Sequence, residues 1–147
     1  MPETRQPEPP LEEEVLRAYD GDPLTRMRVH TLAVAASDEA WTDARVLARH
    51  AVTQDVAGQI YRAVGSIGAN IAEGYSRSSP RDRARFYEYA LGSAREAREW
   101  YLRGRAVLGR ERWTRATARL NEISRILVAI LRRVHRDDPT RRTGFSF

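Results

Sequence analysis

Apolar residues recur every three or four positions along four long stretches of the chain, which is the spacing of helices that bury one face. The last stretch is the most regular, with Trp113, Ala116, Leu120, Ile123, Leu127, Ile130 and Val134. An earlier stretch carries Val56, Ile60, Val64, Ile67 and Ile71. No segment shows the two-residue alternation of a half-buried strand. The pattern predicts an all-α protein, an antiparallel up-down four-helix bundle.

Local signals set the bounds of the first two helices. Asp22 followed by Pro23 predicts an N-cap and the first turn of a helix of about eighteen residues. The stretch SDEAWTDARVLARHAVTQD could continue that helix or interrupt it before a second helix that begins near Thr53. The Ser-rich turn at 76–79 is expected to end this second helix.

The third and fourth helices have clearer ends. Ser79 and Pro80 predict the start of the third helix, and Gly109 stands where a terminating glycine is expected, nearly thirty residues later. The motif Asp138-Pro139 is expected to close the fourth. The sequence therefore divides into an acidic, proline-rich, largely disordered head at 1–22, in which LEEEVLRAYD could form a short helix, a bundle at 23–136, and a flexible basic tail at 137–147.

Charge is distributed unevenly along the chain. All 25 basic residues are arginine, and the net charge is +5. The first 22 residues carry seven acids and two arginines, a net of −5, so the remaining chain carries +10. A basic body favours a polyanionic partner such as nucleic acid, although a solvated surface has the same composition. The acidic head could mask that body or be a solvated tail.

Several classes of function lack the residues they need. The chain has no cysteine, and neither a phosphate-binding loop nor a nucleophile elbow occurs. His30, His50 and His135 do not have the spacing of a helical metal site. No apolar run is long enough for a membrane span, and no leader is evident. We expect a cytoplasmic protein with no cofactor, no metal and no membrane association, and we expect that it is not an enzyme.

A polar stripe runs beside the apolar face of the second helix. Its members recur at steps of three or four: Gln59, Arg62, Ser66, Asn70, Glu73 and Arg77. Small residues such as Gly65, Gly68 and Gly74 lie between them and would let a neighbouring element approach closely. The stripe is interpreted as a structural seam between helices or subunits, with ligand contact as the alternative.

Arginines on the third and fourth helices are the candidates for nucleic-acid contact. They are Arg85, Arg95, Arg98, Arg112, Arg115, Arg119, Arg132 and Arg133, interleaved on the third helix with tyrosine and tryptophan. Arginine binds phosphates and aromatic rings stack on bases. Along the sequence, only Glu111 and Glu122 lie among the arginines of the fourth helix up to Arg136. A solvated face and an oligomeric protein scaffold or adaptor remain alternatives.

Two segments carry a resemblance to a known family. SIGANIAEGYSR at 66–77, preceded by Gln59-Ile60-Tyr61-Arg62, and ALGSAREA at 90–97 resemble the proteins encoded by intervening sequences in 23S ribosomal RNA genes, the S23 family. The resemblance covers about residues 24–136. Gly68 stands where the family usually has proline, and Met27 stands near the place of a tryptophan.

The resemblance carries expectations of its own. Family members are four-helix bundles that form homopentameric rings, so self-association into a pentamer is expected. A related branch contains accessory proteins of diversity-generating retroelements, which bind nucleic acid and a reverse transcriptase. The resemblance thus implies a non-enzymatic, oligomeric nucleic-acid-binding protein, with a reverse transcriptase or another protein as a further partner.

Overall fold

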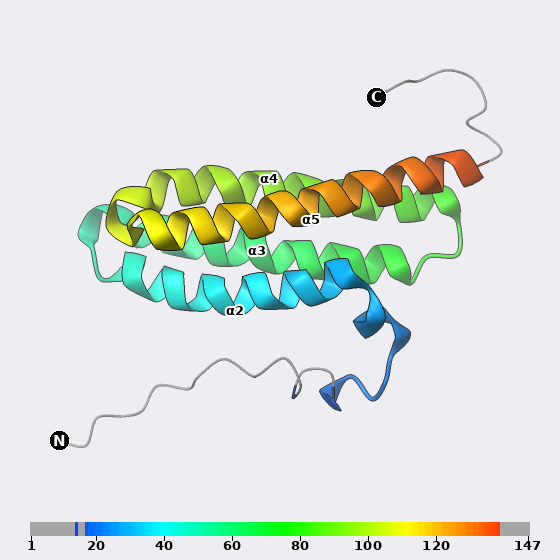
Figure 1. The fold of residues 1–147 in the computed structure, drawn as a ribbon, viewed down its shortest axis with the longest axis horizontal. Helices are drawn as coiled ribbons and strands as arrows, with labels where there is room; N and C mark the ends of the chain where they lie inside the picture. The colour runs from blue at the N-terminus through cyan, green and yellow to red at the C-terminus, as the bar shows by residue number, and fades with distance from the viewer. Residues whose placement is uncertain (1–13, 15–16, 139–147) are drawn as a thin grey trace.

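The computed structural model describes residue 14 and residues 17–138, and four long helices dominate this part of the chain (Figure 1). They are α2 (Arg28–Ala48), α3 (Gln54–Tyr75), α4 (Pro80–Leu108) and α5 (Arg110–Asp137). Successive helices run in opposite directions, and α3 packs against α2 and α4, while α5 packs against α4 and, less extensively, α2. No strand occurs in the described residues, so the predicted all-α four-helix fold is confirmed.

The beginning of the first helix differs from the prediction. Asp22 caps a short 3-10 helix, η1 (Pro23–Arg26), by accepting a hydrogen bond from the Leu24 amide at 2.9 Å. Met27 is extended, and α2 starts only at Arg28 without a side-chain cap. An N-cap followed by proline satisfies the first turn of either helix type, because both leave the same amides unpaired. The capping signal therefore located the turn correctly and assigned it to the wrong helix.

The ambiguous stretch after the first helix proves to be continuous helix as far as Ala48. A short 3-10 turn, η2 (Ala51–Thr53), then leads into α3, so the second helix begins where the sequence predicts. The Thr53 hydroxyl donates to the carbonyl oxygen of Leu47 at 2.8 Å. This buried bond ties the link to the end of α2.

Both predicted ends of α4 are confirmed. The Ser79 side chain accepts a hydrogen bond from the Asp82 amide at 3.2 Å, and Pro80 occupies the first turn. Gly109 has a φ of 83°, a conformation that favours glycine, and separates α4 from α5.

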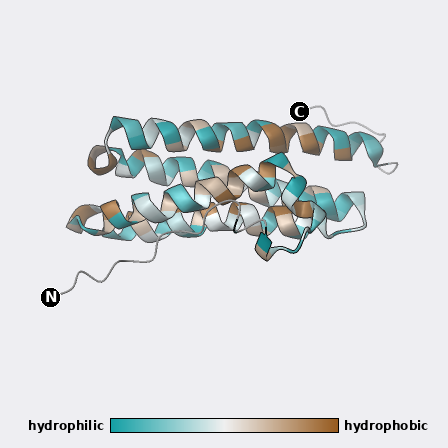
Figure 2. Ribbon diagram, turned by 60° about the horizontal axis from the view of Figure 1, so that its bottom comes forward, coloured by the Kyte–Doolittle hydropathy of each residue, from teal (hydrophilic) through white to brown (hydrophobic). Residues whose placement is uncertain are grey.

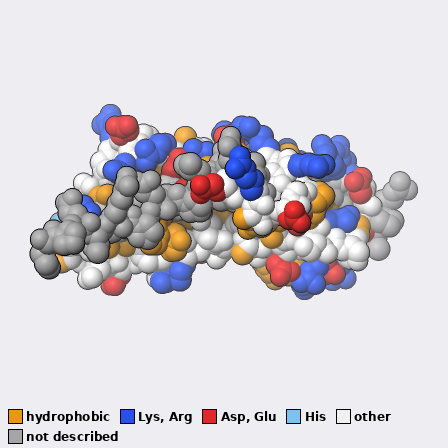
Figure 3. All heavy atoms as spheres, turned by 90° about the horizontal axis from the view of Figure 1, so that it is seen from below, with side chains coloured by type: hydrophobic (Ala, Val, Ile, Leu, Met, Phe, Trp, Pro, Cys, Tyr) orange, Lys and Arg blue, Asp and Glu red, His pale blue; other side chains and the backbone are white. Residues whose placement is uncertain are grey.

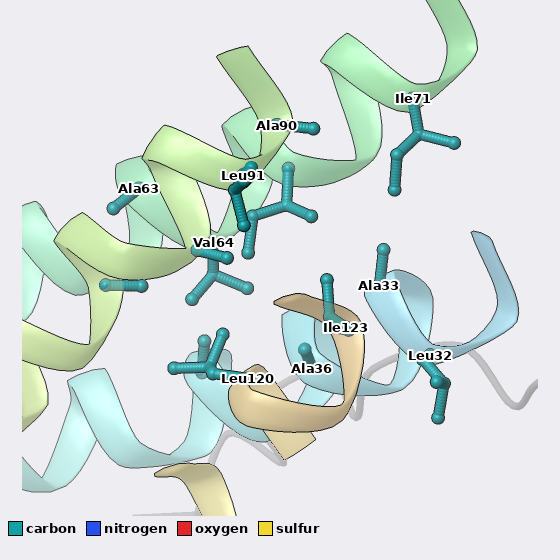
Figure 4. Packing of buried hydrophobic residues seen from close by; sticks show 14 of the residues in the cluster. Leu32, Ala33, Ala36, Ala63, Val64, Ile71, Ala90, Leu91, Leu120 and Ile123 are labelled. Carbon is teal, nitrogen blue, oxygen red and sulfur yellow. The ribbon is translucent and has the colours of Figure 1, made fainter. Parts of the chain in front are cut away.

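The core is made by all four helices (Figure 4). Ile71 and Val64 of α3 point toward Ala33 and Ala36 of α2, and Leu120 and Ile123 of α5 point into the same space. Apolar and polar positions alternate along α5, as Figure 2 shows by colour. Of the apolar stripe predicted for this helix, Ala116, Leu120, Ile123 and Leu127 are buried. Leu131 is also buried, whereas Trp113, Ile130 and Val134 lie at the edge of the core.

Two glycines lie where a Cβ would be crowded by a neighbouring side chain. A Cβ at Gly74 would lie 2.7 Å from the Tyr87 ring, and one at Gly104 would lie 3.0 Å from Leu47. At Gly68 a Cβ would meet Ala33 at an ordinary 3.9 Å, and at Gly65 it would meet nothing within 4 Å. The small-residue stretch therefore allows close approach at Gly74, while Gly65 is exposed.

The terminal predictions fall mostly outside this structure. Residues 1–13 and 15–16 of the acidic head and residues 139–147 of the basic tail lie outside the described residues. In the part of the chain that is described, no helix combines the length and apolar character needed to cross a membrane.

Candidate nucleic-acid interface

Positive charge is concentrated on one pair of helices. Together α4 and α5 contain fifteen arginines and seven acidic residues, whereas α2 and α3 contain three arginines and five acidic residues. Seen from the α2 side, basic side chains are most numerous along the edge that α5 forms, with acidic side chains among them (Figure 3). A polyanion would therefore meet the α4–α5 side of the bundle first.

Some of this charge is neutralised inside the bundle by a buried carboxylate. Asp43 of α2 is fully buried and accepts hydrogen bonds from the Tyr101 hydroxyl at 2.9 Å and from Arg112 at 3.1 Å. The Arg115 guanidinium lies 3.7 Å from the same carboxylate. Burial, and then the adjacent Asp43 charge, raise the pKa of the Tyr101 hydroxyl, so it stays protonated and donates to Asp43.

A second set of ion pairs continues along the contact between α2 and α5. Arg119 binds both oxygens of the Glu39 carboxylate through its Nε, at 3.1 Å each, and contacts Oε1 through a terminal nitrogen at 2.7 Å. Arg28 pairs with Glu122 across the same contact. Polar pairing thus joins α5 to α2, a helix pair whose contact is less extensive than that between α4 and α5.

These pairs change the interpretation of four candidate arginines, including Arg115, which lies within 4.0 Å of both Glu39 and Asp43. Arg112 and Arg119 bind carboxylates of α2, and Arg98 donates to Asn121 of α5 at 2.8 Å. The expectation that α5 has few acidic neighbours is wrong, because the neutralising groups come from α2, about 70 to 80 residues away in sequence. Asp43 itself follows Ala36 and Ala40 at core spacing, which is the signal that could have revealed it.

Four other candidates are exposed. Arg85 and Arg95 project from the first half of α4, and Arg132 and Arg133 project from the last turns of α5. Arg85 lies 3.9 Å from Asp82, while no ion pair with a described residue is found for the other three. Because α4 and α5 are antiparallel, Arg85 near the start of α4 lies at the same end of the bundle as Arg132 and Arg133, while Arg95 lies near the middle of α4.

Aromatic rings accompany the arginines at this end. The guanidinium groups of Arg77 and Arg85 lie 4.9 Å and 5.2 Å from the centre of the Phe86 ring. Phe86 in turn contacts Tyr89 edge-on at 5.8 Å. The Tyr89 side chain is 53% exposed, which leaves its ring accessible for stacking. We call Arg85, Phe86, Tyr89, Arg95, Arg132 and Arg133 the basic–aromatic end.

The predicted polar stripe lies on the outer side of α3, with Arg77 just beyond the end of the helix, and its side-chain hydrogen bonds join one member of the stripe to another. Ser66 donates to the carbonyl of Arg62 at 3.0 Å, Asn70 donates to the carbonyl of Ser66 at 2.8 Å, and Glu73 pairs with Arg77 at 2.7 Å. Gln59 is half-buried. These hydrogen bonds therefore do not link α3 to another helix, and a seam between subunits stays a prediction.

The histidines are separate from one another. His30 is buried beside Tyr19, His50 caps the turn before α3, and His135 lies 3.7 Å from Glu88. No group of three or more metal-binding side chains occurs within the described residues.

The helical fold is shared with known proteins. The family model of the 23S rRNA-intervening sequence protein matches residues 27–129. A solved structure from Bacteroides thetaiotaomicron, a protein of unknown function from the S23 ribosomal protein family, is 24% identical and has a TM-score of 0.64. The similarity covers 70% of this chain and 97% of that chain. No curated protein matches the sequence.

An all-helical bundle with a basic α4–α5 side is thus the class of protein that the structure defines. The chain belongs to the 23S rRNA-intervening sequence protein family. The family resemblance noted in the sequence is confirmed, while the solved structure supports the four-helix fold alone.

Proposed function

We propose that this protein is a non-enzymatic nucleic-acid-binding bundle that contacts the phosphate backbone through its basic–aromatic end. The observation that carries the proposal is that Arg95 and Arg132, two exposed arginines with no ion pair to a described residue, line one groove between α4 and α5, on the helix pair that also carries the exposed Tyr89 ring. Arginine contacts to phosphate supply sequence-independent affinity, and a tyrosine ring can stack on an unpaired base.

Single-stranded RNA or DNA is the class of ligand that this surface suits. The arginines lie on the outer surface of two adjacent helices, and the described residues offer no projecting recognition helix of the kind that enters a major groove. The exposed ring favours strands whose bases are unpaired. We therefore expect little dependence on sequence.

The proposal includes self-association into a homopentamer, which rests on the family resemblance. A ring would repeat the basic–aromatic end once per subunit, so weak contacts would add through multivalency. The exposed face of α3 around Gly65 and Ser66 is available for such a contact in the isolated chain. A reverse transcriptase is the further protein partner that the resemblance implies.

The experiment is fluorescence anisotropy with labelled single-stranded RNA, single-stranded DNA and an RNA–DNA hybrid, over a range of salt concentrations. Affinity that falls steeply with salt supports phosphate contacts. Light scattering on the same samples gives the mass of the assembly. No affinity for any of the three probes at low salt would contradict the proposal and favour a protein scaffold or adaptor.

A further inference from the structure

A groove of about 340 Å³ lies between the first half of α4 and the last turns of α5. Its apolar lining comes from Leu91, Val128 and Leu131. Charged and polar side chains also line it: Glu88, Arg95, Arg132 and His135. The volume is at the lower end of the range of about 300–1,000 Å³ for small-ligand pockets, which suits one or two aromatic side chains.

Gly92 of α4 also lines this groove. A glycine inside a helix costs about 1 kcal/mol relative to alanine. A Cβ at Gly92 would meet no atom within 4 Å, so nothing in the described bundle requires a glycine there. A larger side chain at this position would extend into the groove that Gly92 helps to line.

We propose that the groove binds the segment that comes after α5, residues 139–147, through Phe145 and Phe147. These are two of the three phenylalanines in the chain, and no other large apolar residue occurs in the segment. In an extended conformation, side chains two residues apart point to the same side. Both rings can therefore face the groove together, with Ser146 facing solvent.

The length of the segment fits this arrangement. Leu131 and Val128 lie seven and ten residues before Asp138 on α5, a distance of about 10–15 Å along the helix axis. The seven residues from Asp138 to Phe145 span at most about 25 Å when extended. The chain can therefore turn after Pro139 and return along α5 with length to spare.

The order of charged residues along the groove is consistent with a segment that returns along α5 toward the start of that helix. A returning segment would pass Glu88 and His135 before it reached Leu91 and Val128, because Glu88 lies next to the last turn of α5. Arg141 and Arg142, which precede the phenylalanines, would then lie near the Glu88 carboxylate. Covalent linkage supplies an effective concentration of about 1 mM or more, so a weak contact would be populated.

The experiment is fluorine NMR on the full chain with 4-fluorophenylalanine at Phe86, Phe145 and Phe147. Leucine substitutions at Phe145 and Phe147 assign the signals, and a labelled peptide of residues 139–147 gives the unbound reference. We expect at least one tail signal to be displaced from the peptide position and broadened. Gly92→Leu should return it to the peptide position by filling the groove.

The matched control is Ala106→Leu, which places the same side chain at an exposed position of α4, fourteen residues away from Gly92. This variant should leave the displaced signal unchanged. Signals of Phe145 and Phe147 that coincide with those of the free peptide in the unmodified protein would overturn the proposal. Equal effects of Gly92→Leu and Ala106→Leu would also overturn it. A displacement that disappears on dilution would place the segment on a neighbouring copy and would also overturn it.

Discussion

The Tyr101 hydroxyl donates a hydrogen bond to the Asp43 carboxylate at 2.9 Å, in the buried space between α4 and α2. Arg112 reaches the other carboxylate oxygen from α5 at 3.1 Å. One buried acidic residue therefore connects three helices. Replacing it with asparagine would leave one amide oxygen for both the hydroxyl and the guanidinium, and no negative charge beside the guanidinium.

We expect Asp43→Asn to lower the free energy of unfolding by roughly 2–3 kcal/mol. Removing one member of a fully buried pair costs about 3–5 kcal/mol, and the partial exposure of Arg112 reduces this. Tyr101→Phe should cost about 1–2 kcal/mol, because one hydrogen bond is lost. Urea denaturation measures both, with the exposed Asp55→Asn as control. Equal stabilities of Asp43→Asn and the control would contradict a structural role for Asp43.

Gly74→Ala and Gly65→Ala should have opposite effects on the free energy of unfolding. At Gly74 the new Cβ would lie 2.7 Å from Tyr87, and such overpacking costs about 1–3 kcal/mol. At Gly65 there is open space, so the gain in helix propensity, up to about 1 kcal/mol, should appear as added stability. Thermal and urea unfolding at low protein concentration compare the two. A shift of the same sign at both sites would refute the packing described for α3 and α4.

His30 should make the fold sensitive to mild acid. Burial lowers the pKa of His30, and the nearby Asp22 charge opposes this only in part. The unfolded chain, with a histidine pKa of about 6.5, then binds the proton more readily, so stability should fall as the pH drops below about 6.5. The raised pKa of Asp38 has the opposite effect on the pH dependence of stability. This contribution is the same in the wild type and in a variant that lacks His30.

His30→Leu isolates this effect. We expect the difference in unfolding free energy between pH 7.5 and pH 5 to be smaller in the variant than in the wild type. Urea denaturation at the two pH values measures it. An unchanged difference would show that His30 does not titrate on unfolding in this range.

Much of this fold could be predicted from sequence because its signals are local. The apolar period of α5 and the Ser79-Pro80 start of α4 depend on neighbouring residues, and both were correct. The start of α2 was misplaced because Asp22 and Pro23 suit a 3-10 turn as well as an α-helix. A cap and a proline specify only the first turn, so they do not determine whether the helix continues beyond Arg26.

The candidate interface was harder to predict because charge neutralisation acts across the bundle. Arg112 and Arg119 appear unpaired in sequence, yet their partners Asp43 and Glu39 lie on α2. Arg132 and Arg133 look similar in sequence and have no ion pair with a described residue. Only the packing of α5 against α2 shows which of these arginines are neutralised by a carboxylate and which are not.

The acidic head should weaken nucleic-acid binding through its charge. Residues 1–13 carry four acids and one arginine, a net of −3 per chain. Deleting them leaves the Asp22 cap and the Tyr19–His30 contact intact, so the bundle should fold as before. We expect tighter binding to single-stranded RNA at low salt, with the difference shrinking as salt screens the charge. Equal affinities at low salt would argue against masking by the head.

The most direct test of nucleic-acid binding is the salt dependence of RNA affinity in Arg132→Gln/Arg133→Gln. Its control is Arg103→Gln/Arg105→Gln, which removes two exposed arginines at the opposite end of α4. If the basic–aromatic end holds phosphates, the first variant should bind more weakly and the slope of log affinity against log salt should decrease by up to about 2, while the control keeps the wild-type slope. Equal slopes in both variants and the wild type would contradict the account.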